Sequence, residues 1–310
     1  MRESFMIFRA AAFVAILLSA LAGSAAAETI TVEHASGKTD VAVNPQKVLV
    51  YDLGALENLD QLGIAVTGVP GSNIPPSLEK YKDAAYAKVG TLFEPDLEAV
   101  NSAEPDLIIV AARSSPHYAA LSAMAPTIDL TLPDQDLVAG VKRNAEIIGK
   151  IFGKETEMKA RIDRLDASIA ELRSLAPQVG TGLILLTTGG KVSAYGKGSR
   201  FGEIHDAFGV LPADTDLQQA THGQAISYEY ILEKNPDWLF VIDRDAAIGQ
   251  QGQSAASLLD NDLVHQTKAW KNGHVLYLDS AKLYLTGAGI QSQQDIVDVL
   301  LKAFHGSLGR

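Results

Sequence analysis

The chain of 310 residues is 47% hydrophobic and 20% charged, an ordinary globular composition at a length that accommodates two modest domains. Its formal net charge of −11 argues against nucleic acid and against an anionic membrane surface as partners. The sequence contains no cysteine, which excludes a disulfide framework, a catalytic cysteine and a lipid-attachment cysteine.

Residues 1–27 have the features of a secretory signal peptide. Arg2 and Arg9 precede the uncharged run AAAFVAILLSALAG, and the small residues SAAA follow it. A basic start, an apolar run and an A-x-A site predict export with cleavage after Ala27. The apolar run is short for a bilayer span. We therefore expect a soluble protein of a Gram-negative periplasm that is not a lipoprotein, with free secretion as the alternative.

Short apolar runs alternate with helical stretches along the rest of the chain. The β-rich runs are KVLVYDL, AVTGV, PDLIIVAA and TIDLTL in the first half, and GLILLTT, KVSAYG, PDWLFVID and HVLYLD in the second. A helical stretch such as GALENLDQLGI, which ends at Gly63, separates neighbouring runs. This alternation predicts an α/β fold with two Rossmann-like lobes, whose mostly parallel sheets are covered by helices.

Between the halves, the segment KETEMKARIDRLDASIAELRSLAP contains a narrow apolar stripe at helical spacing. The stripe consists of Met158, Ile162, Leu165, Ile169 and Leu172. Gly153 precedes the segment and Pro177 closes it, which predicts one long helix. An ordinary surface helix shows the same pattern, but the position between two halves favours a rigid strut equally. The expected organisation is an N-terminal lobe over residues 28–152, a connecting helix over 153–177 and a C-terminal lobe over 178–310.

One pattern occurs twice without a gap. LEAVNSAEPDLIIVAAR and YEYILEKNPDWLFVIDR align so that Glu98 matches Glu229 and Arg113 matches Arg244. Each copy predicts a helix, a turn and a buried strand that closes on an arginine. Because ligands bind beyond the carboxyl ends of strands in open α/β sheets, both guanidinium groups are expected in a ligand cleft between the lobes.

The signal peptide, the two lobes, the long helix and the duplicated motif together resemble the class III periplasmic binding proteins of ABC importers, over essentially the whole mature chain. The resemblance implies a binding protein, not an enzyme, that delivers a ferric siderophore, haem or vitamin B12 to a permease dimer in the inner membrane. It also implies that Glu98 and Glu229, one on each lobe, dock onto arginines of the permease. Either glutamate alone would be an ordinary solvated helix residue, but the register-matched pair favours docking. We expect a monomer.

Three arginines point to the chemistry of the ligand. The third, Arg200, lies in YGKGSRFGEI, a glycine-rich turn that would offer backbone N–H groups to an anion. Three arginines at strand or loop ends of an acidic chain predict a pocket for a multiply charged anion. Since guanidinium groups also stack on aromatic faces, a ferric catecholate fits best. Tyr118 and Tyr195 are further candidates to line the cleft, although each is equally compatible with packing inside its own lobe.

His222 lies in the loop ATHGQAISYEYI and Tyr284 in LDSAKLYLTGAG. The pattern resembles the enterobactin-type binding proteins, in which one histidine and one tyrosine bind iron directly. The resemblance implies that these two residues complete the Fe(III) coordination left open by tetradentate catecholates, and both are acceptable donors for this ion. A lone loop histidine is more often an exposed titrating group.

The alternatives concern the ligand and the class of protein. Haem, a corrinoid or a hydroxamate siderophore would suit the same class of binding protein, and haem could use Tyr284 or His222 as an axial ligand. A nearly neutral hydroxamate complex would not call for three arginines. The other histidines lack the spacing of a preformed metal cage, so we expect no intrinsic cofactor. The sequence also lacks the G-x-S-x-G and HExxH motifs that a secreted hydrolase would show.

Overall fold

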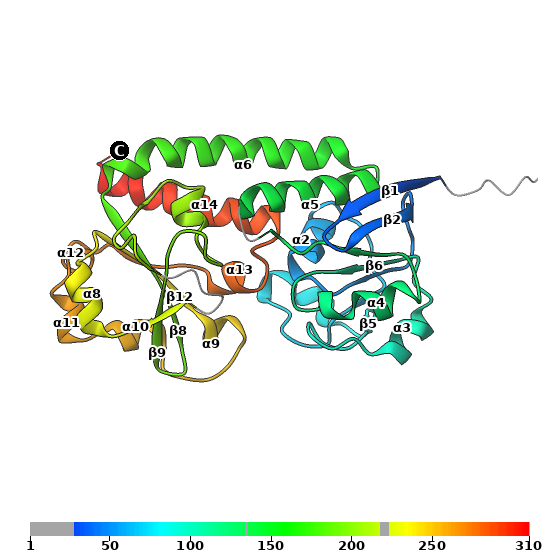
Figure 1. Cartoon of the computed structure of the whole chain (residues 1–310), viewed down its shortest axis with the longest axis horizontal. Coiled ribbons are helices and arrows are strands. Elements are labelled where there is room, and N and C mark those ends of the chain that lie inside the picture. The colour runs from blue at the N-terminus through cyan, green and yellow to red at the C-terminus, as the bar shows by residue number, and fades with distance from the viewer. Residues whose placement is uncertain (1–27, 134–135, 218–222, 310) are drawn as a thin grey trace, which may run out of the picture.

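The computed structural model describes residues 28–133, 136–217 and 223–309, which form two α/β lobes beneath one long helix (Figure 1). The predicted signal peptide and His222 lie outside these residues. Within the described ranges, no helix has both the length and the apolar character needed to cross a bilayer.

The N-terminal lobe contains a five-stranded parallel sheet of order β5-β4-β3-β6-β7. Its strands are β3 (Val48–Val50), β4 (Gly68–Val69), β5 (Ala87–Lys88), β6 (Leu107–Val110) and β7 (Thr127–Asp129). Its helices are α2 (Leu53–Gln61), α3 (Leu97–Ala103), α4 (Tyr118–Ser122) and α5 (Leu137–Ile151), with 3-10 turns at Pro76–Lys82 and Ser115–His117. Strands β3 and β6 are buried at every position, as the continuous apolar runs predict for a covered parallel sheet.

A hairpin that the sequence did not predict precedes this sheet. Strands β1 (Thr29–His34) and β2 (Gly37–Ala42) pair antiparallel and pack beside β7. Each strand buries a single residue fully, Val32 in β1 and Val41 in β2. One buried residue per strand gives no recognisable alternation of apolar and polar positions.

The C-terminal lobe contains a mixed sheet of order β11-β9-β8-β12-β13, with β10 beside the start of β8. Its strands are β8 (Thr181–Thr188), β9 (Lys191–Tyr195), β10 (Leu211–Pro212), β11 (Gln224–Ile226), β12 (Trp238–Asp243) and β13 (Val275–Tyr277). Its helices are α7 (Glu203–Asp206), α8 (Tyr228–Lys234), α9 (Arg244–Ala247), α10 (Ala255–Leu259), α11 (Asp262–His265), α12 (Lys268–Lys271), α13 (Ser280–Tyr284) and α14 (Ile290–Ser307), after a 3-10 turn at Ala176–Gln178. Strand β9 runs antiparallel to β8 because the two-residue turn between them reverses the chain, with Gly189 and Gly190 at φ 54° and 74°.

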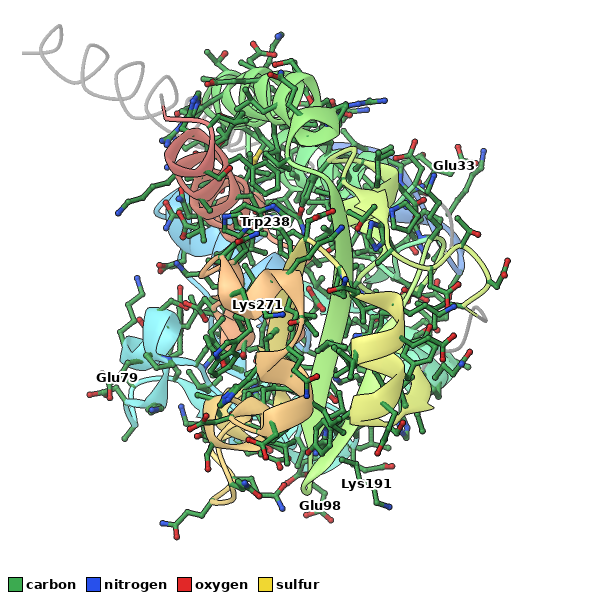
Figure 2. All side chains as sticks on the ribbon, turned by 90° about the vertical axis from the view of Figure 1, so that its left-hand side faces the viewer. Glu33, Glu79, Glu98, Lys191, Trp238 and Lys271 are labelled. Atoms are coloured by element: carbon green, nitrogen blue, oxygen red, sulfur yellow. The ribbon has the colours of Figure 1, made fainter. Side chains whose placement is uncertain are left out.

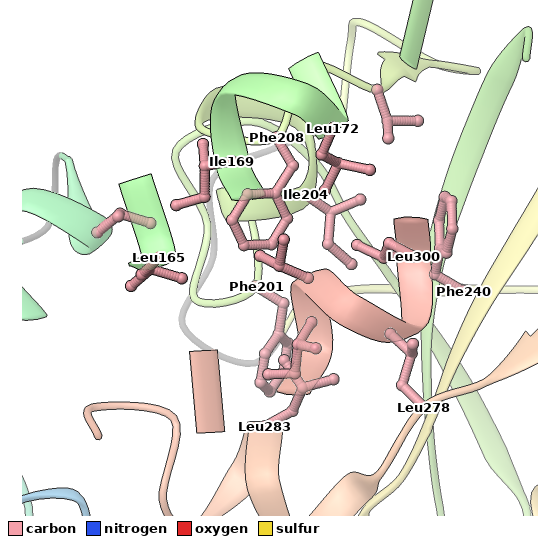
Figure 3. Close-up of a cluster of buried hydrophobic side chains, with 14 of the residues drawn as sticks. Leu165, Ile169, Leu172, Phe201, Ile204, Phe208, Phe240, Leu278, Leu283 and Leu300 are labelled. Atoms are coloured by element: carbon pink, nitrogen blue, oxygen red, sulfur yellow. The ribbon is translucent and has the colours of Figure 1, made fainter. Parts of the chain in front are cut away.

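The long helix is α6 (Glu155–Leu175), whose 21 residues extend about 32 Å. All five residues of the predicted stripe are buried, which confirms the helical interpretation of the segment. Helix α6 packs on α5 in the N-terminal lobe and on α14 in the C-terminal lobe, and it spans both lobes in Figure 1. Figure 3 shows Leu165, Ile169 and Leu172 of α6 facing a cluster that includes Phe208 and Leu300 of the C-terminal lobe.

A second connection between the lobes holds the start of α14. This helix has no side-chain cap of its own, and two residues of α2 supply one. The carboxylate of Glu57 accepts hydrogen bonds from the backbone N–H and the hydroxyl of Ser292, at 2.9 and 2.7 Å. The side-chain oxygen of Asn58 accepts from the N–H of Ile290 at 3.0 Å. Glu57 is only 3% exposed, and burial raises its pKa to about 7.

Candidate functional site

The duplicated motif folds in the same way in both lobes. Helices α3 and α8 each contain seven residues, and each ends on a left-handed cap, Glu104 with φ 45° and Asn235 with φ 44°. A left-handed residue at this position turns the chain sharply back toward the sheet. The following proline cannot continue the helix. The repeat therefore specifies a tight helix-to-strand turn in each lobe.

The aspartate after each proline anchors this turn to the neighbouring strand. Asp106 accepts a hydrogen bond from the N–H of Lys47 at 2.8 Å, just before β3. Asp237 accepts from the N–H of Thr181 at 2.9 Å, at the start of β8. Each aspartate thus satisfies a backbone N–H that enters the parallel sheet. The P-D pair has a structural role in both lobes.

Arg113 and Arg244 follow the carboxyl ends of β6 and β12, as the repeat predicts, and both reach Tyr284 at the end of α13. The Nη2 atoms of Arg113 and Arg200 each donate a hydrogen bond of 2.9 Å to the carbonyl oxygen of Tyr284. The Nε atom of Arg244 donates to the Tyr284 hydroxyl at 3.1 Å. We call these four residues the arginine cluster. It lies where the two lobes meet, since Arg113 belongs to the N-terminal lobe and the other three to the C-terminal lobe.

The ring of Tyr284 is surrounded by positive charge. The guanidinium carbons of Arg113, Arg200 and Arg244 lie 5.5, 4.2 and 5.7 Å from the ring centre, within cation–π range. Burial alone would raise the pKa of the Tyr284 phenol. The hydrogen bond from Arg244 and the charges of Arg200 and Arg244 outweigh burial and hold that pKa below its ordinary value. Burial lowers the pKa of Arg113, and the nearby charge of Arg200 lowers it further. An anion bound here would relieve the repulsion between the guanidinium groups.

Two carboxylates that the sequence analysis did not single out border the arginine cluster. Asp245 is buried, accepts from Gly189 N–H at 2.7 Å and lies 3.5 Å from Nη1 of Arg244. Asp52 caps α2 through the N–H of Ala55 at 2.8 Å, and its charge acts on Arg113. The three guanidinium groups therefore have two carboxyl groups nearby, and burial raises the pKa of one of these, Asp52, so the cluster remains cationic. Asp52 comes shortly after β3 and Asp245 shortly after β12. Their positions just beyond strand ends could have identified both from the sequence as residues near the ligand site.

The glycine-rich turn around Arg200 uses two of its N–H groups for hydrogen bonds within the protein. The N–H of Gly198 donates to the carboxylate of Asp206 at 2.7 Å, and the N–H of Gly202 donates to the carbonyl of Ser199 at 2.9 Å. These two N–H groups are therefore satisfied within the protein, and binding of an anion by the remaining N–H groups of the turn stays a prediction. Arg200 contributes through its side chain.

The two other predicted tyrosines, Tyr195 and Tyr118, each contact residues of their own lobe. Tyr195 is 3% exposed, with its ring edge-on to Phe201 at 4.9 Å, and burial raises its pKa. The ring of Tyr118 lies 5.5 Å from that of His34, and its hydroxyl lies 3.4 Å from Thr39 in the β1–β2 hairpin. Their contact with a ligand stays a prediction.

The predicted docking residues are both exposed, and each is the second residue of its helix. Strand β11 leads into α8, and its last residue, Ile226, lies level with Thr187 across β9. Glu229 is therefore near the carboxyl end of β8. In Figure 2, Glu98 lies at the bottom edge of the molecule, well below Trp238, the first residue of β12. The carboxyl ends of the strands and both glutamates thus belong to the same side of the protein.

Residues 28–133, 136–217 and 223–309 contain no group of three or more acidic or histidine side chains that would hold a metal ion. Of the two predicted iron donors, Tyr284 lies within the described residues and His222 lies outside them. Its phenol lies in a setting that favours the ionised form, which is the form that binds Fe(III).

Comparisons with known proteins agree with this architecture. A family model described as periplasmic binding protein matches residues 48–281. The chain is 46% identical over 275 residues to the petrobactin-binding protein YclQ of Bacillus subtilis (strain 168), covering 87% of this chain and 86% of YclQ. It is 33% identical over 282 residues to the ferric-anguibactin-binding protein FatB of Vibrio anguillarum, covering 89% of this chain and 88% of FatB.

A solved structure extends the comparison. The periplasmic catecholate-siderophore binding protein VctP of Vibrio cholerae superposes with a TM-score of 0.84 at 34% identity, covering 88% of this chain and 99% of VctP. The family and these relatives are substrate-binding proteins, not enzymes. The match over most of the sequence, together with the two α/β lobes joined by α6, shows that the chain belongs to the periplasmic binding protein family.

Proposed function

We propose that the chain captures a ferric siderophore of the catecholate type, including tetradentate members, and delivers it to an ABC permease for iron uptake. The observation that carries the proposal is the convergence of Arg113, Arg200 and Arg244 on Tyr284. A ferric catecholate is an anion built from aromatic rings, and guanidinium groups bind both the charge and the ring faces. The names of YclQ, FatB and VctP, which refer to petrobactin, ferric anguibactin and catecholate siderophores, support this ligand class.

The arginines have two roles in this proposal. They attract the anionic complex, and they favour the phenolate of Tyr284 by lowering its pKa. Phenolate is a hard oxygen donor suited to Fe(III), so the lowered pKa supports Tyr284 as a residue that completes the iron coordination sphere. His222 remains the proposed second donor on the basis of the sequence alone. No intrinsic cofactor is needed, because the iron arrives with the siderophore.

The most direct test is a titration of the mature protein with ferric bis-catecholate, ferric tris-catecholate, ferric hydroxamate, haem and cobalamin, followed by protein fluorescence and visible absorbance. We expect the two catecholates to bind at least tenfold more tightly than the hydroxamate, a difference of about 1.4 kcal/mol or more, because both catecholate complexes are anionic and the hydroxamate complex is nearly neutral. Tightest binding of haem with a Soret band, or of cobalamin, would contradict the proposed ligand class.

The same proposal assigns Glu98 and Glu229 to docking on the permease, and the predicted signal peptide of residues 1–27 supports a periplasmic location for this encounter. Replacing both glutamates by arginine is expected to reduce iron uptake by roughly tenfold or more, since opposed like charges at an interface cost several kcal/mol. Ligand affinity should stay within twofold, because neither side chain belongs to the arginine cluster. Uptake of radioactive iron would be measured in cells that lack other binding proteins.

Glu33→Arg provides the matched control for this charge reversal. Glu33 is also exposed, but it lies on the β1–β2 hairpin, at the upper right of the molecule in Figure 2 and far from Glu98 at the bottom. Its replacement should leave uptake unchanged. Normal uptake by the Glu98→Arg/Glu229→Arg protein, or an equal loss in the Glu33→Arg protein, would remove the docking assignment.

A further inference from the structure

Phe93 is an exposed aromatic residue beside the arginine cluster. It lies in the loop between β5 and α3, and 55% of its surface is exposed. Its ring centre is 6.0 Å from the guanidinium carbon of Arg113. Among described residues, the other rings near these guanidinium groups are Tyr284, which is partly buried, and Phe201, which is 1% exposed. Phe93 therefore offers the most accessible aromatic surface at the cluster.

The loop holds Phe93 in a defined position. The Thr91 hydroxyl accepts hydrogen bonds from the N–H groups of Phe93 and Glu94, at 3.1 and 2.9 Å. The N–H of Thr91 in turn donates to the carbonyl of Glu94 at 2.8 Å. Gly90 has φ 111°, and a Cβ atom there would lie 2.3 Å from the same carbonyl, so the turn requires glycine. A loop whose backbone is fixed before binding loses little conformational entropy on contact with a ligand.

The loop also lies on the correct side of the lobe. Lys88, the last residue of β5, pairs with Val69 at the end of β4 in the parallel sheet. The chain beyond Lys88 therefore leaves at the carboxyl edge, where Arg113 also emerges after β6. Ligands of open α/β sheets bind at this edge.

We propose that Phe93 is a specificity-determining residue that stacks on an aromatic ring of the ferric siderophore, while Arg113 binds the oxygens of that ring. This inference rests on the proposed function, and it restricts the ligand to siderophores that present an aromatic ring beside Arg113. A catecholate binds more tightly through both Phe93 and Arg113, because it presents an aromatic face to the first and negatively charged oxygens to the second. A ferric complex made only of carboxylates gains from the arginines but has no ring to stack.

The test compares two anionic probes, a ferric bis-catecholate with an aliphatic linker and ferric citrate. Phe93→Leu is expected to weaken binding of the bis-catecholate about 2- to 12-fold, the effect of losing an aromatic pair worth about 0.5–1.5 kcal/mol. Binding of ferric citrate should change less than twofold. Phe93→Trp keeps an aromatic face and should bind the bis-catecholate as tightly as the wild type. Tyr277→Leu is the matched control, since Tyr277 is 43% exposed on β13, and it should affect neither probe.

The outcomes separate this inference from the proposed function. A wild-type protein that does not bind the bis-catecholate would remove both. If the wild type binds it and Phe93→Leu binds it equally well, or loses both probes to the same extent, the stacking role alone is wrong. Unchanged affinity with reduced iron uptake would place Phe93 on the permease-facing surface with Glu98, and would also overturn the stacking role. Circular dichroism and the melting temperature of Phe93→Leu would show whether any loss reflects unfolding.

Discussion

Tyr284→Phe is expected to weaken binding of a ferric bis-catecholate by about 100-fold or more, since losing even an outer-shell partner of a metal ligand typically costs about 10- to 100-fold in metal affinity. Fe(III) in these complexes takes six donors, and a bis-catecholate supplies four, which leaves two positions open to donors from the protein. A tris-catecholate supplies all six and should lose far less. Phenylalanine keeps the ring that faces the three guanidinium groups, so the loss reports the hydroxyl specifically. Fluorescence titration of both complexes measures the difference.

The visible spectrum provides an independent measurement of the same event. Wild-type protein should shift the charge-transfer band of the bis-catecholate, as water or hydroxide gives way to protein donors. His222→Ala should show the same selective loss of affinity, and the double variant should lose the shift. Equal losses for both complexes would make the two residues walls of the site rather than iron ligands. A band that does not move on binding would exclude coordination by the protein.

Replacement of Arg244 by methionine is expected to have two linked effects. Binding of either ferric catecholate should weaken about 10- to 150-fold, because a charge-assisted contact in a partly buried site contributes about 1.5–3 kcal/mol. The pKa of Tyr284 should also rise, because Arg244 donates to the hydroxyl and adds positive charge beside it. Because the phenolate is the proposed iron donor, the affinity for a bis-catecholate is expected to increase with pH through this pKa. In the variant, that increase should move to higher pH.

Ultraviolet titration of tyrosinate would measure the pKa of Tyr284 directly. The Tyr284→Phe protein would identify which ionisation in the titration belongs to this residue. Arg164→Met is a suitable control, because Arg164 is exposed on α6 and pairs with Asp298. Alanine variants of Arg113 and Arg200 complete the series. The basic-site interpretation would be wrong if the variants of all three cluster arginines bound within twofold of the wild type.

The predictable part of the fold was the part in which apolar residues follow a period. Strands such as β6 and β12 are continuous buried runs, and the stripe of α6 is buried throughout. The β1–β2 hairpin was missed because one buried residue in each strand leaves no pattern. The capping of α14 by Glu57 was also missed, since a contact between residues 235 positions apart leaves no mark on either local sequence.

The residues of the candidate site that follow strand ends could be predicted from the sequence. Arg113 and Arg244 were found because a repeated strand closes on each of them, whereas Tyr284 was singled out by resemblance to a known family. Their meeting on one carbonyl and one hydroxyl depends on how the lobes pack, which periodicity does not describe. Phe93 lies in a turn built from local hydrogen bonds, where an aromatic residue carries no periodic signal.

The capping of α14 by α2 has a consequence for the order of folding. Glu57 and Asn58 are made early in synthesis, but their partners belong to the last helix of the C-terminal lobe. Ala288, just before that helix, also packs against Gly54, where a Cβ atom would lie 2.6 Å from it. A carboxylate that is 3% exposed in the native protein therefore stays without its partners until nearly the whole chain has been made. Contacts so distant in sequence delay folding. An N-terminal lobe made without the last helix therefore lacks the hydrogen-bond partners of Glu57 and Asn58, so its native structure is completed only when the C-terminal lobe is present.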